Sequence, residues 1–251
     1  MITDCQVKDG VDLDFLTWIG RGIMDLRPDV IVNIGDFADM PSLGLFDRGR
    51  KSFEGRRYRI DIAAAHRGMD LLLEPLRVYN RMRAKNKKSQ YAPRMILTLG
   101  NHEERIIRAT EAEAMLDGTI GIDDLKYAEA GWEVHPFLEV VTVEGVAFSH
   151  FFSGGALGKP ISSAQALLSK KHMSCVAGHQ QGRQVAYGYR ADGKRITGII
   201  AGSTYLHDES YMNPQGNATH WRGIVLLDNV NDGEFDEHFL SLDALKAKYA
   251  D

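Results

Sequence analysis

Short apolar runs that end in polar residues recur along this chain. Each run is followed by Asp, Asn or His, in most cases directly after a glycine. With the residues that follow them, the four runs are Val30–Asp39, Met95–Glu103, Val146–His150 and Cys175–Gln181. Such runs are typical of buried strands in parallel sheets. Since ligands bind at the carboxyl ends of these strands, the pattern predicts that the polar side chains meet at one edge of a sheet.

A fifth polar turn, with Asp4 and Gln6, stands at the start of the chain. Only Met1, Ile2 and Thr3 precede it, which is short for a strand. Either the first strand is reduced to a few residues, or the natural chain begins further upstream.

Other segments have the apolar spacing of helices that cover a sheet. They are residues 13–26, a long segment 57–87 that we expect to bend near Pro75, and segments 103–116, 122–130 and 162–171. A strand over 132–137 and hairpins over 140–148, 184–201 and 223–240 complete the pattern. This order predicts an α/β fold, a four-layer α-β-β-α sandwich of two mixed sheets with helices outside, formed by residues 1–251 as a single domain.

Composition narrows the class of protein. The 251 residues are 44% hydrophobic and 25% charged, and the net charge of −4 gives no global polybasic signature. The cysteines, Cys5 and Cys175, form no Cys-x-x-Cys pair, which favours a reduced, cytoplasmic protein. No run approaches the roughly 18 apolar residues of a membrane span, and no signal peptide is evident. We therefore expect no membrane association, and nothing points to an obligate protein partner.

In chain order, the polar positions resemble the pattern of the calcineurin-like metallophosphoesterases. That family has D-x-H, G-D-x-x-D, G-N-H-E/D, a lone His and G-H-x-H. The corresponding residues here are Asp4 with Gln6, Asp36 with Asp39, Asn101 with His102, His150, and His179 with Gln181. Each element is weak alone, but all five occur in order across about residues 1 to 240.

The resemblance implies a site with two divalent metal ions, in which a metal-activated hydroxide attacks a phosphoester. Asp36 would bridge the two ions, because a carboxylate has two oxygens to share. The second ion would be held by Asp36 together with Asn101, His150 and His179, and these positions match the family pattern.

The first ion is where the chain departs from the pattern. Positions 6 and 181 are Gln instead of His, so that its ligands would be Asp4, Gln6, Asp36 and Gln181. An all-oxygen set favours hard cations, Mn²⁺ first, with Mg²⁺, Fe²⁺, Zn²⁺ and Ni²⁺ as other candidates. Asp-x-Gln also resembles the Mn²⁺-dependent ADP-ribose pyrophosphatase branch of the family. The alternative is a degenerate first site and a protein with one metal ion or none.

His102 follows Asn101 and would act in catalysis instead of binding metal. By resemblance, it protonates the leaving oxygen while Asp39 holds its imidazole. A carboxylate beside an imidazole fixes its tautomer and raises its pKa, which suits a general acid.

Candidate substrate contacts lie in two loops. Arg48 and Arg50 belong to a basic cluster that could bind phosphate groups or form a solvated surface, and His207 and His220 lie in a polar loop over 202–222. We expect a metal-dependent phosphoesterase acting on a phosphodiester or a nucleotide, with a DNA nuclease as one version. The alternatives are a nucleotide phosphatase or pyrophosphatase, and a non-catalytic scaffold that binds with the same fold.

Overall fold

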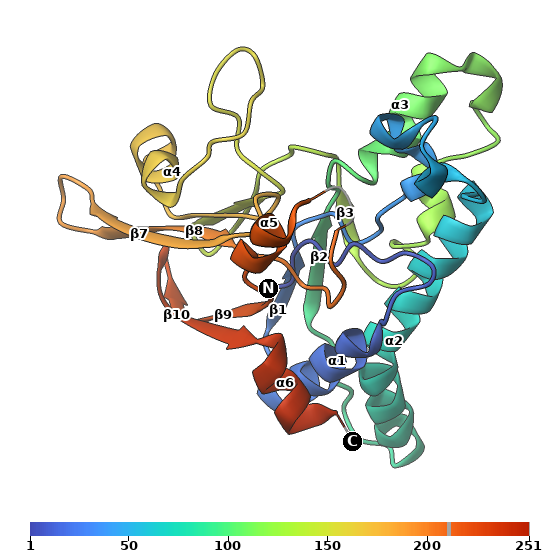
Figure 1. Cartoon of the computed structure of the whole chain (residues 1–251). Helices are drawn as coiled ribbons and strands as arrows, with labels where there is room; N and C mark the ends of the chain where they lie inside the picture. Colours follow the sequence, from blue (N-terminus) through green and yellow to red (C-terminus); the bar gives the residue numbers. More distant parts are fainter. Residues whose placement is uncertain (210–211, 251) are drawn as a thin grey trace.

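A computed structural model describes residues 1–209 and 212–250 (Figure 1). The helices are α1 (Asp14–Leu26), α2 (Tyr58–Lys85), α3 (Glu104–Ala112), α4 (Ala164–Lys171), α5 (Pro214–Thr219) and α6 (Leu242–Tyr249). The strands are β1 (Val30–Asn33), β2 (Arg94–Thr98), β3 (Glu133–His135), β4 (Val141–Val143), β5 (Val146–Ser149), β6 (Cys175–Ala177), β7 (Arg183–Tyr189), β8 (Arg195–Ala201), β9 (Gly223–Asn231) and β10 (Glu234–Ser241). The predicted α/β class with mixed parallel and antiparallel pairing is confirmed.

Two layers of strands lie at the centre. One contains the parallel strands β1, β2 and β3, and the other has the mixed order β4-β5-β6-β8-β7. The hairpin β9–β10 joins the first layer through the amino terminus, because Met1 and Val225 are linked by two backbone hydrogen bonds while Ile2 pairs with Asn33 of β1. Before the first polar turn, the described chain has an isolated bridge at Ile2 and no assigned strand.

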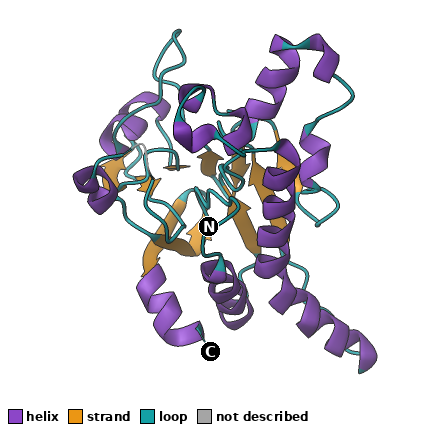
Figure 2. Cartoon of the chain, turned by 45° about the vertical axis from the view of Figure 1, so that its right-hand side comes forward, coloured by secondary structure: helices purple, strands orange, loops and turns teal. Residues whose placement is uncertain are grey.

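Side chains alternate along the strands and fill the spaces between layers. Val146 and Phe148 of β5 face the core between the two sheets, whereas Ala147 faces the core under α4. In β1, Val32 lies between the sheets and Ile31 faces the core under α1 and α2. Helices therefore lie outside a pair of stacked sheets, with α1, α2 and α6 on one side and α4 on the other (Figures 1 and 2).

The long predicted helix is present as α2, and Pro75 lies inside it. It packs closely on α1 at Gly20, where a side chain would come within 2.3 Å of the Leu72 carbonyl oxygen. This contact explains the glycine, since only a residue without a Cβ fits there.

Some predicted elements differ. The helix expected over 122–130 is one 3₁₀ turn at Ile122–Leu125, which ends at Lys126 with a left-handed φ of 56°. The segment 103–116 divides into α3 and a 3₁₀ turn at Ala114–Leu116. The helices α5 and α6 were not predicted. Apolar spacing over a few residues does not distinguish a buried turn from a helix, and this accounts for the two segments that were predicted as longer helices.

No helix in the described parts of the chain has both the length and the apolar character of a membrane span. Both cysteines are buried and free.

Candidate metal centre

The predicted ligands lie in the turns that follow the central strands, and many have a strained backbone. Residues other than glycine seldom adopt a positive φ, because this conformation costs roughly 1–3 kcal/mol per residue. Those that do adopt it cluster at functional sites. Here the φ angles are 44° at Asp4 and Gln6, 52° at Asp36, 67° at His179 and 59° at Gln181. The fold holds these side chains in conformations that it would not need for packing alone.

Asp36, Asn101, His150 and His179 converge on one point. Asn101 Oδ1 lies 2.9 Å from His150 Nε2 and 2.8 Å from His179 Nδ1. Asp36 Oδ2 lies 3.4 Å from His150 Nε2. Ligand atoms of Asp36, His150 and His179 all fall within 4.8 Å of one another. The set predicted to hold the second metal ion is therefore brought together.

The tautomer of His150 makes this cluster suitable for a cation. Its Nδ1 lies 2.8 Å from the Ile34 carbonyl oxygen, so that Nδ1 must carry a proton and donate it. In the neutral ring, Nε2 then presents a lone pair to the oxygens of Asn101 and Asp36. Acceptors that face one another need a proton or a metal ion between them. Imidazole nitrogen with carboxylate and amide oxygen is a donor set that first-row divalent metals accept.

The charges around this point favour a cation. Burial opposes the charged form of Asp36, but His102 and His150 outweigh it and hold the pKa of this carboxyl well below its usual range. Burial likewise lowers the pKa of His150, yet the Asp36 and Asp4 carboxylates raise it to about 9. His179 differs, because burial and the neighbouring His150 lower its pKa to about 4. Without metal, a proton on His150 takes the place of the cation.

The predicted ligands of the first ion differ from one another in their hydrogen-bond partners. Asp4 is fully buried, and its Oδ2 accepts hydrogen bonds from the Thr3 hydroxyl and from His179 N–H at 2.9 Å. Its Oδ1 and both amide atoms of Gln6 have no hydrogen-bond partner among the described residues. Backbone hydrogen bonds from Asp4 N to Gly35 O and from Gln6 N to Asp36 O keep this segment beside the cluster. Two unsatisfied oxygens of this kind fit a hard cation.

Gln181 does not share this arrangement. Its Oε1 accepts a hydrogen bond of 2.7 Å from the hydroxyl of Tyr205, which in turn lies 2.7 Å from His220 Nδ1. The predicted fourth oxygen of the first ion thus already has a partner. Asp4, Gln6 and Asp36 lie together as a possible ligand set. The contacts of Gln181 do not support its predicted role as a fourth ligand.

His102 and Asp39 form the predicted pair. His102 Nδ1 lies 2.8 Å from Asp39 Oδ1, and its Nε2 lies 3.7 Å from Asp36 Oδ2. Burial lowers the pKa of His102, but the Asp36 and Asp39 carboxylates outweigh it and raise the pKa above its usual value. The backbone N–H of His102 donates to Asp36 Oδ1 at 2.8 Å. The ring is therefore beside the cluster, with Nε2 as its free nitrogen.

A chain of charges extends from this pair into a neighbouring loop. Lys8 Nζ lies 2.9 Å from Asp39 Oδ2 and 2.8 Å from Glu209 Oε1, and the same oxygen lies 2.8 Å from His207 Nε2. Arg105 donates to the Asp39 carbonyl oxygen at 2.7 Å. Lys8, Arg105 and Glu209 were not among the predicted site residues. The position of Lys8, two residues after the predicted ligand Gln6, could have indicated that it lies near the site. Nothing in the sequence linked it to Glu209.

Glu103 fixes the backbone of two loops. Its buried carboxylate accepts hydrogen bonds from the N–H groups of Asp36 (3.0 Å), Ala38 (2.9 Å) and Gly100 (2.9 Å). The turns after β1 and β2 are thereby held in one geometry, which positions Asp36 against Asn101.

Glycines allow the loops to approach the carboxylates. A side chain at Gly100 would lie 2.1 Å from Asp36 Oδ1, and one at Gly178 would lie 2.5 Å from Asp4 Oδ2. This explains why Gly precedes Asn101 and His179, since any larger residue would displace a ligand.

A pocket of about 760 Å³ adjoins His102. Of the four residues predicted to contact substrate, Arg50 and His207 line it, whereas Arg48 and His220 do not. Arg48 is exposed at the end of a 3₁₀ turn, and His220 lies against the Tyr205 hydroxyl. Much of the pocket's charge is paired internally, for example Arg56 with Asp47 at 2.8 Å. Contact of these four residues with a substrate stays a prediction, and two of them lie at the pocket.

A scan against protein-family models finds no match to this chain, and a search of curated proteins also finds none.

Proposed function

We propose that this chain is a metal-dependent phosphoesterase of the calcineurin-like type, acting on a phosphodiester or a nucleotide. The observation that carries the proposal is the convergence of Asp36, Asn101, His150 and His179 directly beside the His102–Asp39 pair. A metal-ligand cluster and an imidazole held by a carboxylate, within reach of the same space, are the components that phosphoester hydrolysis needs.

In this proposal, divalent cations bound at the site would supply polarisation of the phosphoryl oxygens and a lower pKa of the attacking water. The residues that would hold and orient a cation are Asp36, Asn101, His150 and His179. Asp39 holds Nδ1 of His102, so that Nε2 carries the proton that is transferred to the leaving oxygen. Burial lowers the pKa of His102, but the Asp36 and Asp39 carboxylates outweigh it and raise the pKa, which favours the protonated ring that a general acid requires.

The pocket beside His102 supports a substrate with a leaving group of nucleotide size. Its volume of about 760 Å³ lies within the ordinary range for small-molecule sites. Arg50 and His207 line it and could contact phosphate or ribose groups. A single-stranded nucleic acid end would fit the same requirement, so that the nuclease and the nucleotide pyrophosphatase remain two versions of the proposal.

One observation favours the alternative, a non-catalytic binding scaffold. Gln181 Oε1 accepts a hydrogen bond from Tyr205, so that only Asp4, Gln6 and Asp36 are left as ligands of the first metal position. We expect one tightly held ion at the Asn101 cluster. A second, weaker position with Asp4 and Gln6 would be filled by Mn²⁺ more readily than by Zn²⁺.

The test combines metal analysis with substrate assays. Protein stripped of metal and then supplied with Mn²⁺ is assayed on bis-p-nitrophenyl phosphate, p-nitrophenyl phosphate, single-stranded DNA and a nucleoside diphosphate sugar. Asp36→Asn is the negative control, and Asp117→Asn, an exposed acid that does not line the pocket, is the matched control. The proposal expects Mn²⁺-dependent hydrolysis that Asp36→Asn alone abolishes. Bound metal with no hydrolysis of any of these substrates would favour the scaffold.

A further inference from the structure

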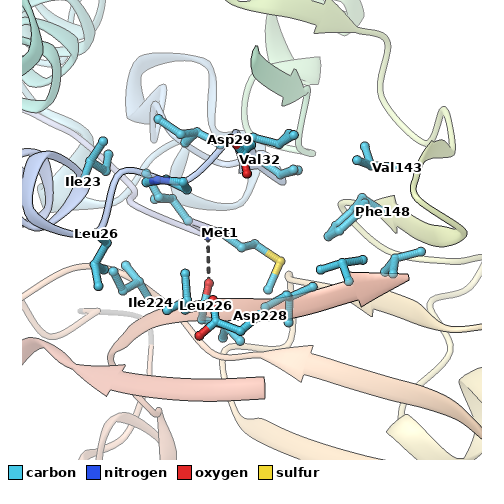
Figure 3. Close-up of a pocket in the computed structure, with 18 of the residues that line it drawn as sticks. Met1, Ile23, Leu26, Asp29, Val32, Val143, Phe148, Ile224, Leu226 and Asp228 are labelled. Carbon is cyan, nitrogen blue, oxygen red and sulfur yellow. Dashed lines mark hydrogen bonds between the residues drawn. The ribbon is translucent and has the colours of Figure 1, made fainter. Parts of the chain in front are cut away.

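The pocket of about 760 Å³ is lined by both members of the pair His102 and Asp39, so that under the proposed function it receives the leaving group. We call it the His102 pocket. Figure 3 shows a different pocket, of about 570 Å³, in which Met1 and Phe148 are among the lining residues. None of the described residues that line this other pocket belongs to the candidate metal centre. The chemistry of the leaving group is therefore to be read from the His102 pocket.

Most charged side chains of the His102 pocket already have a partner of opposite charge within the protein. These contacts include Lys8–Asp39 (2.9 Å), Lys8–Glu209 (2.8 Å), Arg56–Asp47 (2.8 Å) and Arg222–Asp208 (2.7 Å). A strongly charged leaving group would have to compete with these pairs. The His102 pocket therefore favours a neutral leaving group.

Asp61 differs from the paired carboxylates of this pocket. It lies in the first turn of α2, it is only 3% exposed, and no cation is in ion-pair contact with it among the described residues. Its Oδ2 accepts a hydrogen bond of 2.9 Å from the Ser42 backbone N–H. Burial raises the pKa of this carboxyl, against the hydrogen bonding from Ser42. Because a carboxylate has about four acceptor positions, Asp61 can accept further hydrogen bonds from a molecule in the pocket.

His207 supplies a second acceptor among the residues that line the pocket. Its Nε2 lies 2.8 Å from Glu209 Oε1, and since a carboxylate only accepts, Nε2 carries the proton. In the neutral ring Nδ1 is then an acceptor, and it has no hydrogen-bond partner among the described residues. The ring stacks on Tyr205 with 4.6 Å between the centroids, which restricts its orientation. Asp61 and His207 thus both require donors, and hydroxyl groups of a ligand can supply them.

We propose that Asp61 selects a neutral leaving group that carries hydroxyl groups, such as a sugar or another polyol. The inference rests on the proposed function, because a leaving group enters this pocket only if His102 protonates one. A carboxylate is the acceptor that binds ribose hydroxyls in dinucleotide sites, and hydrogen bonds to a charged acceptor are stronger than those between neutral groups. The selection favours the nucleotide or sugar version of the proposed function over the nuclease, whose substrate is a polyanionic strand.

The test compares four phosphate esters on the Mn²⁺-loaded protein, by calorimetry and by competition with the hydrolysis of bis-p-nitrophenyl phosphate. Glycerol 3-phosphate and n-propyl phosphate are the matched pair, because their carbon chains have the same length and only the first carries hydroxyls. The charged esters are 3-aminopropyl phosphate, a cation at its far end, and 3-phosphoglycerate, an anion there. Glycerol 3-phosphate should bind about tenfold or more tighter than n-propyl phosphate and tighter than both charged esters.

Asp61→Asn keeps the size of the side chain and an oxygen for the Ser42 N–H, but removes the charge. It should reduce the preference for glycerol 3-phosphate over n-propyl phosphate to about twofold or less, while n-propyl phosphate binds as before. Asp70→Asn is the matched control, since Asp70 is exposed on the same helix, pairs with Arg77 at 2.6 Å and does not line the pocket. A purely structural role of Asp61 would instead weaken both esters equally.

Equal affinity of the unmodified protein for the two matched esters would overturn the proposal, and so would a preference that Asp61→Asn retains. Tightest binding of 3-aminopropyl phosphate would show that the pocket selects a cation, and binding of none of the esters would also contradict the proposal. Protein that binds the esters as expected but hydrolyses no phosphoester would refute the proposed function alone. Asp61 would then select a bound ligand instead of a leaving group.

Discussion

His150 Nε2 and Asn101 Oδ1 face each other at 2.9 Å, although Nδ1 of the same ring is already directed at the Ile34 carbonyl oxygen. The Nε2 position therefore holds either a proton or a metal ion. His179 Nδ1 contacts the same amide oxygen at 2.8 Å, and Asp36 contributes negative charge at the same point. This arrangement links the metal hypothesis to measurable proton release.

Metal binding should release protons at neutral pH. In the metal-free protein the pKa of His150 is about 9, so that its ring is charged at pH 7 and must lose a proton to bind a cation. The affinity should rise about tenfold per pH unit between pH 7 and 9. Calorimetry in two buffers of different ionisation enthalpy measures this directly. Release of no proton at pH 7 would show that His150 is not a ligand.

The same shift predicts the stability of the metal-free protein. The pKa of His150 is raised above the value near 6.5 that it has when unfolded, so its contribution is fully present below pH 6.5 and is lost as the pH rises through about 9. The melting temperature without metal should therefore fall over this window, and saturation with metal should remove the decline. An identical pH profile with and without metal would contradict this.

His102→Ala should lower turnover while metal content stays nearly unchanged. A general acid typically contributes about 10²–10⁴-fold, and the loss should be smaller for p-nitrophenyl esters, whose leaving group hardly needs protonation. His135→Ala, at a partly exposed ring outside the cluster, is the matched control. Loss of metal in His102→Ala would instead make His102 a ligand.

Lys8→Met should impair the site without touching the metal. Lys8 joins Asp39 to Glu209, and without its ammonium two buried carboxylates lose their shared partner. We expect turnover to fall roughly 10–100-fold, as for other groups that support a site through its ligands. Lys248→Met removes an exposed ion pair with Asp25 and serves as control. A change confined to melting temperature, with normal turnover, would make the Lys8 network purely structural.

The prediction from sequence succeeded where local pattern and a general rule of sheets combine. An apolar run followed by glycine indicated the ends of β1, β2 and β6, and the meeting of parallel strand ends brought Asp36, Asn101 and His179 together. The structure also explains why glycine follows such a run, because Gly100 lies too close to Asp36 to carry a side chain.

Contacts between residues distant in the sequence could not be predicted in this way. Lys8 and Glu209 are 201 positions apart in the sequence. The Tyr205 hydroxyl that donates to Gln181 Oε1 belongs to a loop without a periodic pattern. Gln6 and Gln181 were predicted to hold the same metal ion, but for this reason their contacts differ. The Gln6 amide lacks a partner among the described residues, whereas the Gln181 amide oxygen accepts a hydrogen bond from the Tyr205 hydroxyl.

Gln6→His with Gln181→His should tighten the first metal position and shift its preference toward Zn²⁺, because imidazole replaces amide oxygen. The contacts add an asymmetry. Gln6→His alone should give most of the gain, since Gln181 already accepts from Tyr205. Competition between Mn²⁺ and Zn²⁺ in the single and double variants measures both effects. Equal gains from the two single variants would contradict the asymmetry.

The central claim, a catalytic metal centre built on Asp36, is tested most directly by titrating metal-free protein with Mn²⁺ while calorimetry and phosphodiesterase rate are recorded together. We predict one tight ion, a second that binds at millimolar Mn²⁺, and a rate that rises with the second. Saturation at one ion with the rate already maximal would make the enzyme mononuclear. Binding of metal at the Asn101 cluster with no hydrolysis at any Mn²⁺ concentration would contradict the claim.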